Sequence, residues 1–317
     1  MTRPLLSIVI PARNEEENIA KMHAALCTVT EALAVELEIV FVDDGSQDAT
    51  RERIAGVQKS DPRVKLVILT RNFGHQAALL AGMEASHGDA VLTLDCDLQH
   101  PPSLIPDMVA AWQSGVAVVE TIRDNTEDAS RFKKLSSRLF YRFMNALSES
   151  PITAGAADFR LLDRAALNDL LRLPDQRPFI RGMVAWLGHP HTALHYVAGA
   201  RSGGRSSYSL KKMISLAIDA ITAFSAKPLR VAFHVGLIAS VLTLVYLTLI
   251  IWRWARGEVV EGWTSLMVVV LFLGATQLIT LGILGEYIGR IYDQTRGRPR
   301  YLTVSETRDR DRNRTAP

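Results

Sequence analysis

The sequence predicts an α/β domain built on a mainly parallel sheet, followed by interface helices and two helices that cross a membrane. Short β-rich runs alternate with helix-compatible segments over residues 5–120, and this rhythm is typical of βαβ units. Two apolar stretches follow in the C-terminal third, at 228–252 and 263–285. Each is longer than the roughly 20 residues that a helix needs to cross the hydrocarbon core of a bilayer.

Five short strands are expected in the first 120 residues, each rich in β-branched and aliphatic side chains. They are LLSIVI (5–10), LEIVFV (37–42), VKLVIL (64–69), AVLTL (90–94) and VAVVE (116–120). Helix-compatible segments separate them, near 15–35, 48–59, 74–87 and 103–114. In a sheet wound this way, ligands bind at the carboxyl ends of the strands.

A polar cluster follows each of the first four predicted strands at its carboxyl end. The clusters are PARNEEEN (11–18), DDGSQD (43–48), RNFGHQ (71–76) and DCDLQ (95–99). Because parallel strands end at the same edge of a sheet, the four clusters are expected to converge. The sequence therefore predicts one site at this edge.

Asp95 and Asp97 end the fourth predicted strand one residue apart. Residues i and i+2 of an extended segment point the same way, and two carboxylates this close repel unless a cation lies between them. Such a pair often only solvates a loop, but its position here favours Mg²⁺ or Mn²⁺, which bind carboxylates together with substrate phosphates. Gln99 is expected to be a further ligand or an orienting group. His75 and His100 lie near the site without identified partners.

Asp43 and Asp44 form a second acidic pair at a strand end. One of them could bind a ribose hydroxyl or a base N–H; the same segment could also be a turn in which Ser46 or Asp48 caps a helix. The two interpretations are compatible. No G-x-G-x-x-G follows a strand and no P-loop motif occurs, which argues against a dinucleotide cofactor and a P-loop NTPase. A net charge of +3 does not indicate a nucleic-acid partner.

Two basic amphipathic helices are predicted, at 131–147 and 208–225. For the first helix, ordinary core packing with a solvated face accounts for the pattern as well as a functional role does. The second directly precedes the first apolar span, so we expect it to lie in the membrane interface.

The opening segment MTRPLLSIVIP has an apolar run too short for a signal peptide, so a cytoplasmic N-terminal domain is expected. Basic residues flank the two spans, whereas the connecting loop has balanced charge, and this places both ends in the cytoplasm. Cys27 and Cys96 are too few for a disulfide framework and suit a reducing compartment. The expected parts are a catalytic domain (1–206), a juxtamembrane amphipathic helix (207–227), two transmembrane helices (228–285) with an external loop (253–262), and a cytoplasmic tail (286–317).

Four motifs, SIVIPARNEEENI, VDDGSQDAT, RNFGHQAALLAGM and DCDLQHPP, resemble those of the family 2 glycosyltransferases of GT-A fold. The later DFRLLDR, FIRGMVAWLG and RSSYSLKKM, followed by two spans, resemble the polyprenyl-phosphate glycosyltransferase branch. That branch is related to dolichyl-phosphate mannose synthase and bactoprenol glucosyltransferase. The resemblance covers about residues 5–300, and it implies a Rossmann-like GT-A catalytic domain.

The resemblance also implies roles for individual residues, each named by the motif position it occupies. The implied nucleotide-sugar contacts are Pro11, Ala12, Asn14, Glu15, Asp43, Asp44, Gly74, Arg123 and Arg160. The implied metal ligands are Asp95, Asp97 and Gln99, and the implied catalytic residues are Asp95, Asp97 and Asp158. The implied contacts with the acceptor phosphate are Arg131, Lys133, Lys134, Arg205, Tyr208 and Lys211. The segment RSGGRSSYS departs from relatives that often have Glu-Ser-Lys, and Arg205 is the candidate to replace that lysine.

The implied activity is inverting transfer of a hexose from a nucleotide sugar, with UDP-glucose expected and a GDP-sugar as the alternative, to a polyprenyl phosphate. Asp158 is expected to orient a sugar hydroxyl or to steady the oxocarbenium-like state. The implied setting is a bacterial inner membrane, with several passes and a homo-oligomer such as a tetramer. Two alternatives remain: another lipid or polysaccharide acceptor, and a non-catalytic scaffold with a decayed transferase fold.

Overall fold

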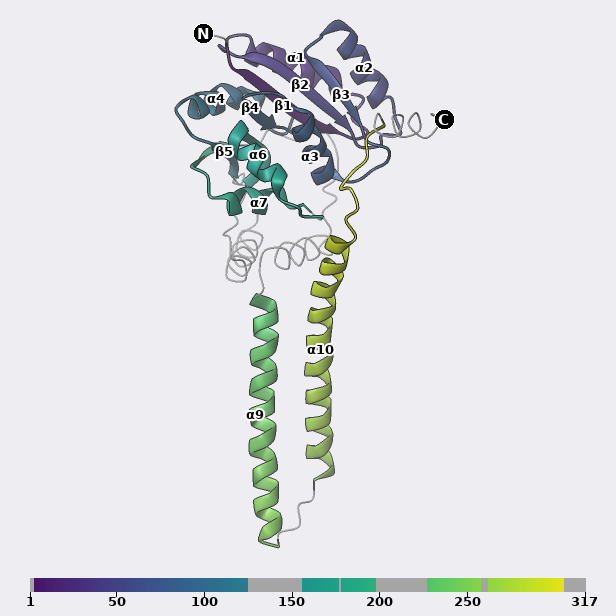
Figure 1. Ribbon diagram of the computed structural model, residues 1–317, viewed down its shortest axis with the longest axis vertical. Helices are drawn as coiled ribbons and strands as arrows, with labels where there is room; N and C mark the ends of the chain where they lie inside the picture. The colour runs from purple at the N-terminus through teal and green to yellow at the C-terminus, as the bar shows by residue number, and fades with distance from the viewer. Residues whose placement is uncertain (1–2, 125–155, 177, 198–226, 258–261, 305–317) are drawn as a thin grey trace, which may run out of the picture. The chain divides into compact units, whose positions relative to one another are not determined.

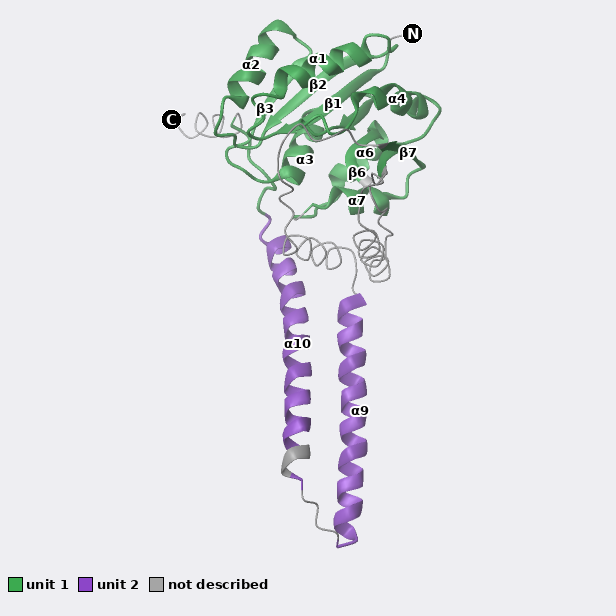
Figure 2. Cartoon of the chain, turned by 180° about the vertical axis from the view of Figure 1, so that it is seen from behind, with its two compact units in different colours: residues 1–141, 150–207, 298–317 green, residues 142–149, 208–297 purple. Residues whose placement is uncertain are grey.

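The computed structural model describes residues 3–124, 156–176, 178–197, 227–257 and 262–304. The chain divides into two compact units (Figure 2). Unit 1 comprises residues 1–141, 150–207 and 298–317, and unit 2 comprises residues 142–149 and 208–297. The predicted domain boundary between 206 and 207 lies outside the described residues, as do the basic helices predicted at 131–147 and 208–225.

Unit 1 is built on a seven-stranded sheet with the strand order β3-β2-β1-β4-β6-β5-β7 (Figure 1). The strands are β1 (Leu5–Ala12), β2 (Glu36–Asp43), β3 (Val64–Ile68), β4 (Ala90–Thr93), β5 (Val118–Asp124), β6 (Ala156–Asp163) and β7 (His191–Val197). β1 pairs in parallel with β2 and β4, β2 with β3, and β5 with β7. Among these strands, β6 alone runs antiparallel to its neighbours. The predicted mainly parallel sheet is confirmed.

Helices follow the strands as the alternation predicts. They are α1 (Ile19–Thr30), α2 (Thr50–Ser60), α3 (His75–Ala85), α4 (Ile105–Gln113), α6 (Arg164–Arg172) and α7 (Ile180–Leu187), with a 3₁₀ turn at Pro102–Leu104. The first helix begins later than the predicted segment at 15–35, because the residues around Glu15 form a loop at the end of β1.

The core is layered on both faces of the central strands. Leu6 and Ile8 of β1 are fully buried in the cluster that α1 and α4 cover. On the other face, a Cβ atom on Gly82 would overlap the side chains of Val9 and Val42. Glycine at this position therefore allows α3 to pack directly on β1 and β2, which fixes the start of α3 at the carboxyl edge of the sheet.

The strands β6 and β7 were not among the five that the sequence predicts. β6 carries Asp158 and Arg160, which are both buried, so two charged side chains interrupt the apolar run that would mark a strand. β7 has the sequence HTALHYV and lies at the edge of the sheet, where only one of its backbone edges is paired.

Unit 2 contains two long helices, α9 (Lys227–Ala255) and α10 (Trp263–Thr295), which pack against each other. Both are long and apolar enough to cross a membrane, with a mean hydropathy of 2.3 over the most apolar window. The described part of the chain covers little of either helix, since 6% of that window is buried in α9 and none of it in α10. α10 continues as a helix ten residues past the predicted end of the second apolar stretch at 285.

A short segment after α10, residues 298–304, belongs to unit 1 and is called the strap below. It forms an antiparallel bridge between Thr303 and Leu69, the residue that follows β3. The strap therefore extends the edge of the sheet beside the predicted site.

Candidate active site

The first four polar clusters converge at one edge of the sheet, as the sequence predicts. β1, β2, β3 and β4 are neighbouring parallel strands, and Ala12 at the end of β1 is paired with Asp43 at the end of β2. Asp44 then donates its backbone N–H to the carbonyl of Ala12 at 3.0 Å. Pro11 and Ala12 are buried as the last residues of β1, so they form the floor beneath the loops.

The first two loops bind each other through Asn14. Asn14 has a backbone φ of 56°, in the left-handed region that non-glycine residues rarely adopt. Its N–H donates to the hydroxyl of Ser46 at 3.1 Å, and its side-chain Oδ1 accepts from the N–H of Gln47 at 2.9 Å. Glu15 donates its N–H to Thr50 Oγ1 at 2.8 Å. These reciprocal bonds hold Asn14 in its unusual conformation and fix the two loops relative to each other.

Asp43 and Asp44 are both buried and both hold the loops together. Asp43 forms an ion pair with Arg51, in which its Oδ2 accepts from Nε at 3.0 Å and from Nη2 at 2.8 Å. Asp44 accepts from the backbone N–H groups of Phe73 and Gly74 at 2.7 and 3.0 Å. Burial raises the pKa of the Asp44 carboxyl, against the two hydrogen bonds that favour its ionised form. Asp44 therefore joins the second polar cluster to the third.

The N-cap of α2 is Ala49, and not Asp48 or Ser46 as the sequence suggested, but Asp48 binds the start of the helix from the residue before the cap. Its Oδ1 accepts from the N–H of Thr50, the first residue of α2, at 3.0 Å. The same atom accepts from the Thr50 hydroxyl at 2.6 Å. These bonds lower the pKa of the Asp48 carboxyl more than its slight burial raises it.

Asp95 and Asp97 are half-buried and differ from Asp43 in their counter-ions. Asp43 pairs with Arg51, whereas no lysine or arginine of the described ranges forms an ion pair with Asp95 or Asp97. Asp97 accepts from the backbone and side-chain N–H groups of Gln99, at 3.0 and 2.5 Å, so Gln99 orients it. The pKa of the Glu15 carboxyl is raised by burial and by the charges of Asp97 and Asp95. The negative charges of Glu15, Asp95 and Asp97 therefore lie close together, and a divalent cation bound here would neutralise them.

His100 and Tyr196 form a chain of hydrogen bonds that ends on Asp95. Nε2 of His100 lies 3.2 Å from Oδ2 of Asp95, and Nδ1 lies 2.5 Å from the hydroxyl of Tyr196. Both rings are buried and pack on Phe159. If Nε2 donates to the carboxylate, Nδ1 of a neutral imidazole must accept from the tyrosine hydroxyl. Tyr196 then fixes the tautomer of His100, and His100 fixes the direction of Asp95.

Asp158, on β6, lies at the centre of a cluster of cationic groups. Arg181 from α7 donates to both of its oxygens, at 2.9 and 3.0 Å, and Arg160 donates to Oδ1 at 3.2 Å. Burial alone would raise the pKa of Asp158, but the hydrogen bond with His75 and the charges of Arg181 and Arg160 lower it far below its ordinary value. Asp158 is therefore ionised at neutral pH and is unsuited to accept a proton.

His75 connects the two acidic parts of the site from the first turn of α3. Its Nε2 lies 3.6 Å from Oδ1 of Asp95 and 3.5 Å from Oδ2 of Asp158. Burial lowers the pKa of the imidazole, but the hydrogen bond with Asp158 and the charge of Asp95 raise it above its ordinary value. The next residue, Gln76, donates to Asp158 at 3.4 Å and accepts from the N–H of Ile180 at 3.0 Å, which ties α3 to α7.

Arg160 and Arg123 occupy the strands beside the cluster. Arg160 is fully buried, and its Nε and Nη1 have no hydrogen-bond partner among the described residues. Arg123 is exposed on β5, in register with Tyr196 of β7. Two cationic groups thus border the acidic pair from the side of β5 and β6.

Family comparison decides the class of protein. Residues 7–171 match the model described as Glycosyl transferase family 2, and residues 227–291 match the model described as GtrB C-terminal hairpin. The chain belongs to glycosyl transferase family 2. It is a glycosyltransferase, with the GT-A fold that its motifs predict.

Curated relatives match this glycosyltransferase over almost its whole length. The uncharacterized glycosyltransferase YkcC of Bacillus subtilis is 39% identical over 93% of this chain and 92% of its own. The bactoprenol glucosyl transferase of Shigella phage SfX is 39% identical, over 95% of this chain and 99% of its own. The prophage bactoprenol glucosyl transferase homolog of Escherichia coli is 37% identical, over 94% of this chain and 97% of its own. The predicted family resemblance is confirmed.

Among solved structures, the fold is similar to glucosyl-3-phosphoglycerate synthase from Mycobacterium tuberculosis, in complex with Mn²⁺, UDP and phosphoglyceric acid. The identity is 20% over 69% of this chain and 76% of that one, with a TM-score of 0.49.

The structure brings most predicted site residues of this glycosyltransferase to one edge of the sheet. The predicted acceptor-phosphate residues Arg131, Lys133, Lys134, Arg205, Tyr208 and Lys211 lie outside the described residues. Five further residues of the site carried no sequence assignment as site residues, namely His75, Gln76, His100, Arg181 and Tyr196. His75, Gln76 and His100 could have been found from their position in the polar loop motifs, and Arg181 from its position in FIRGMVAWLG. Tyr196 gave no signal, because it lies in an edge strand far along the chain.

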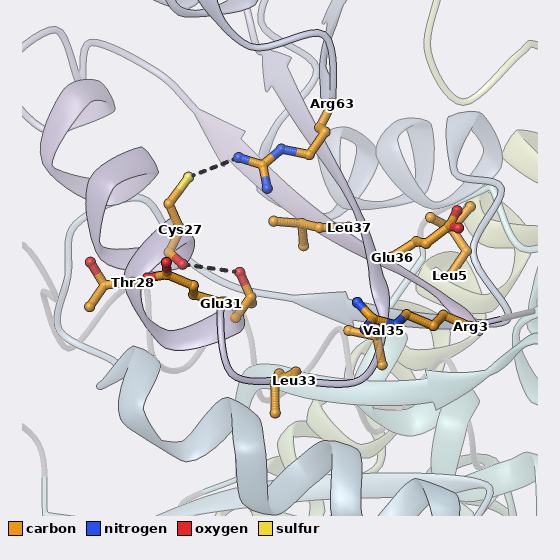
Figure 3. A pocket seen from close by; sticks show the side chains of 11 residues that line it. Arg3, Leu5, Cys27, Thr28, Glu31, Leu33, Val35, Glu36, Leu37 and Arg63 are labelled. Carbon is orange, nitrogen blue, oxygen red and sulfur yellow. Dashed lines mark hydrogen bonds between the residues drawn. The ribbon is translucent and has the colours of Figure 1, made fainter.

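A pocket lies at the opposite edge of the sheet, where β1 and β2 begin, and Cys27 and Arg63 are among the residues that line it (Figure 3). In the described part of the chain, His23, Cys27 and Asp61 have donor atoms within 4.8 Å of one another. The guanidinium of Arg63 donates to Asp61 at 2.7 Å and to Cys27 Sγ at 3.3 Å. A cation therefore already neutralises this group, and we assign it as an ion-paired cluster that holds α1 against the start of β3.

Proposed function

We propose that this glycosyltransferase transfers glucose from UDP-glucose to a polyprenyl phosphate with inversion at the anomeric carbon. The observation that carries the proposal is 37–39% identity, over at least 94% of this chain, to proteins named bactoprenol glucosyl transferase or its homolog. The match to the GtrB C-terminal hairpin over 227–291 supports the same branch.

The residues at the acidic edge fit a divalent cation, Mg²⁺ or Mn²⁺. Asp95 and Asp97 offer hard oxygen ligands, Gln99 orients Asp97, and His100 orients Asp95. Without a lysine or arginine counter-ion in the described ranges, the pair needs an external cation to offset its charge. When bound, such an ion supplies positive charge beside the diphosphate of the leaving group.

The donor is held, in this proposal, by the loops that Asn14, Asp44 and Gly74 fix in place. The acceptor phosphate needs no strong general base, because a phosphate monoester with a second pKa near 6 is largely dianionic at pH 7. This agrees with Asp158, whose lowered pKa suits a permanent anion. Asp158 holds the guanidinium of Arg181 at the site, where positive charge can offset the repulsion between two anionic substrates.

The same proposal places the protein in a bacterial inner membrane with the catalytic unit on the cytoplasmic side. Two helices of sufficient length and apolarity support an enzyme that meets a lipid-linked acceptor. We further propose a homo-oligomer, with a tetramer as the state to test, on the resemblance to the polyprenyl-phosphate glycosyltransferase branch. No nucleic-acid partner is proposed.

The test is transfer of labelled sugar by the purified full chain in detergent or nanodiscs. It is incubated with undecaprenyl phosphate, Mg²⁺ or Mn²⁺, and a panel of UDP- and GDP-sugars, and the label is measured in the organic phase. UDP-glucose is expected to give the strongest signal, and chelation is expected to abolish it. Asp95→Asn and Asp97→Asn should remove the signal, whereas Asp107→Asn, on the exposed face of α4, is the matched control.

Three other results would replace the proposal. Label from a GDP-sugar alone would change the donor. Transfer to a diacylglycerol lipid or a polysaccharide, with none to the polyprenyl phosphate, would change the acceptor. Binding of nucleotide without transfer under any of these conditions would favour the non-catalytic scaffold.

A further inference from the structure

The strap is bonded to the backbone at the carboxyl end of β3. The carbonyl of Leu302 accepts from the N–H of Thr70 at 2.9 Å, beside the antiparallel bridge between Leu69 and Thr303. Leu69 in turn donates its N–H to the carbonyl of Asp43 at 3.0 Å. Leu69 therefore links the strap to Asp43, the last residue of β2 and the first of the polar cluster at 43–48.

Two side chains anchor the strap to further elements of unit 1. The hydroxyl of Tyr301 donates to Glu84 in the last turn of α3, and the guanidinium of Arg300 donates to the carbonyl of Leu173, which follows α6. The strap thus contacts β3, α3 and the end of α6, three elements that are far from it in the sequence. These contacts fix its course across the carboxyl edge of the sheet.

The strap binds the start of the loop at 70–74, and the polar cluster at 43–48 binds the rest of the loop. The N–H groups of Phe73 and Gly74 donate to Asp44. A Cβ atom on Gly45 would lie 2.6 Å from the backbone nitrogen of Asn72, so the two loops are in direct contact there. Gly74 has a φ of 98°, a backbone conformation that glycine adopts readily and other residues rarely do.

Helix α3 starts immediately after this loop, and its first residue reaches into the acidic centre. His75 lies 3.6 Å from Asp95 and 3.5 Å from Asp158. The other end of α3 is where Tyr301 binds Glu84. The strap therefore contacts both the segment that precedes α3 and the last turn of α3 itself.

We propose that the strap is a positioning element of the donor-nucleotide site. It orders the loop at 70–74 and the start of α3, so that the affinity for the nucleotide depends on residues that follow the second membrane-length helix. This inference rests on the proposed function for the identity of the ligand. The ordering of the loop itself can be measured without any ligand.

The test compares four variants with the full chain, all purified in nanodiscs. Truncation after Gly297 removes the strap, and truncation after Ser305 is the matched control that keeps it. Tyr301→Phe, alone and combined with Glu84→Gln, removes one side-chain anchor and leaves the backbone pairing in place. UDP affinity is measured by calorimetry with Mn²⁺ present, and hydrogen exchange is measured over residues 70–76 without nucleotide.

We expect truncation after Gly297 to weaken UDP binding about tenfold, as loss of one or two hydrogen bonds that order a loop would do. Tyr301→Phe should weaken it about threefold, and truncation after Ser305 should have no effect. Exchange at Phe73 and Gly74 should accelerate with the loss of the strap. The KM for the sugar donor should rise while the KM for the lipid acceptor stays constant.

One outcome overturns the positioning role. If truncation after Gly297 and Tyr301→Phe accelerate exchange at Thr70 only, with Phe73, Gly74 and UDP affinity unchanged, the strap is a passive anchor. If the intact chain binds a nucleotide other than UDP, the proposed donor fails, and the exchange data still decide whether the strap orders the loop.

Discussion

Asp158→Asn tests the electrostatics of the site most directly. The Asp158 carboxylate is 9% exposed and accepts from Arg181 and Arg160. Asparagine keeps the shape of the side chain but removes its charge. The fully buried guanidinium of Arg160 then loses its counter-ion, and the paired position of Arg181 is no longer held.

The expected loss of stability follows from burial. Removing one member of a buried ion pair costs about 3–5 kcal/mol, because the remaining charge is left without a partner. Arg181 has a 34% exposed side chain and can regain water, so we expect the lower end, about 3 kcal/mol. For a domain of about 150–250 residues, this corresponds to a fall of about 6–12 °C in the unfolding midpoint.

The pH dependence of this loss has a defined sign. The pKa of Asp158 is lower in the folded chain than in the unfolded one, so its stabilising contribution is present above the ordinary pKa of about 3.9. The contribution is lost as the pH falls through the folded pKa. The difference in midpoint between the native chain and Asp158→Asn should therefore shrink below about pH 4. Because Asp158 also raises the pKa of His75, the difference should grow as the pH falls from 8 through that raised pKa before it shrinks.

Two assays check the prediction, thermal unfolding of the chain in detergent and sugar transfer to polyprenyl phosphate. A misplaced Arg181 guanidinium should reduce transfer by about 10²-fold. Asp107→Asn, exposed on α4, controls for the chemistry of the substitution. Near-normal transfer together with an unchanged unfolding midpoint would show that Asp158 neither organises the cations nor supports catalysis.

Three further predictions follow from the same contacts. Asp95→Asn and Asp97→Asn should each abolish saturable Mn²⁺ binding measured by electron paramagnetic resonance, and retained binding would locate the metal elsewhere. Tyr196→Phe removes the hydroxyl that fixes His100, so Mn²⁺ affinity should fall about tenfold with little change in fold; unchanged affinity would remove Tyr196 from the site. Burial raises the pKa of the Glu38 carboxyl, but its hydrogen bonds lower this pKa to about 2. Glu38 therefore stabilises the fold fully above about pH 4.5, and its contribution falls as the pH falls toward 2. Unfolding of Glu38→Gln should accordingly differ from the native chain at pH 7 and converge with it near pH 2, and equal midpoints at pH 7 would refute this.

The sequence predicted the strands whose runs are mostly apolar. The runs at 5–10 and 37–42, in β1 and β2, each contain a single polar residue, Ser7 and Glu38, and are otherwise apolar because both faces of the central parallel strands are buried. Their polar ends converge because the strands are parallel neighbours. The same reasoning correctly predicted which loops converge at one edge of the sheet.

What sequence reasoning missed depends on contacts between distant segments. Asp158 and Arg181 lie 23 residues apart, and His100 and Tyr196 lie 96 residues apart, so no local pattern pairs them. β6 escaped prediction because Asp158 and Arg160 interrupt it, and burying two charges is tolerable only when the fold supplies partners. The function of such residues becomes visible only once the sheet is assembled.

Asp43 has both a role implied by its motif and a structural role in the fold. The motif implied a base or ribose contact, and in the structure its carboxylate is fully buried against Arg51 and the N–H of Ser46. The structure therefore shows that Asp43 holds the loop together, whereas its contact with a nucleotide stays a prediction.

If α10 crosses a bilayer, as we propose, its length makes bilayer thickness a physical variable for this protein. Its 33 residues span about 50 Å at 1.5 Å per residue, against about 30 Å of hydrocarbon. The charged residues Glu286, Arg290 and Asp293 all lie in its last third, so this end belongs in the headgroup or aqueous phase. A thicker or thinner bilayer would change the tilt of this continuous helix, and the displacement would reach the chain just after Thr295. Lipid composition is thus expected to alter the rate even when the concentrations of both substrates are held constant.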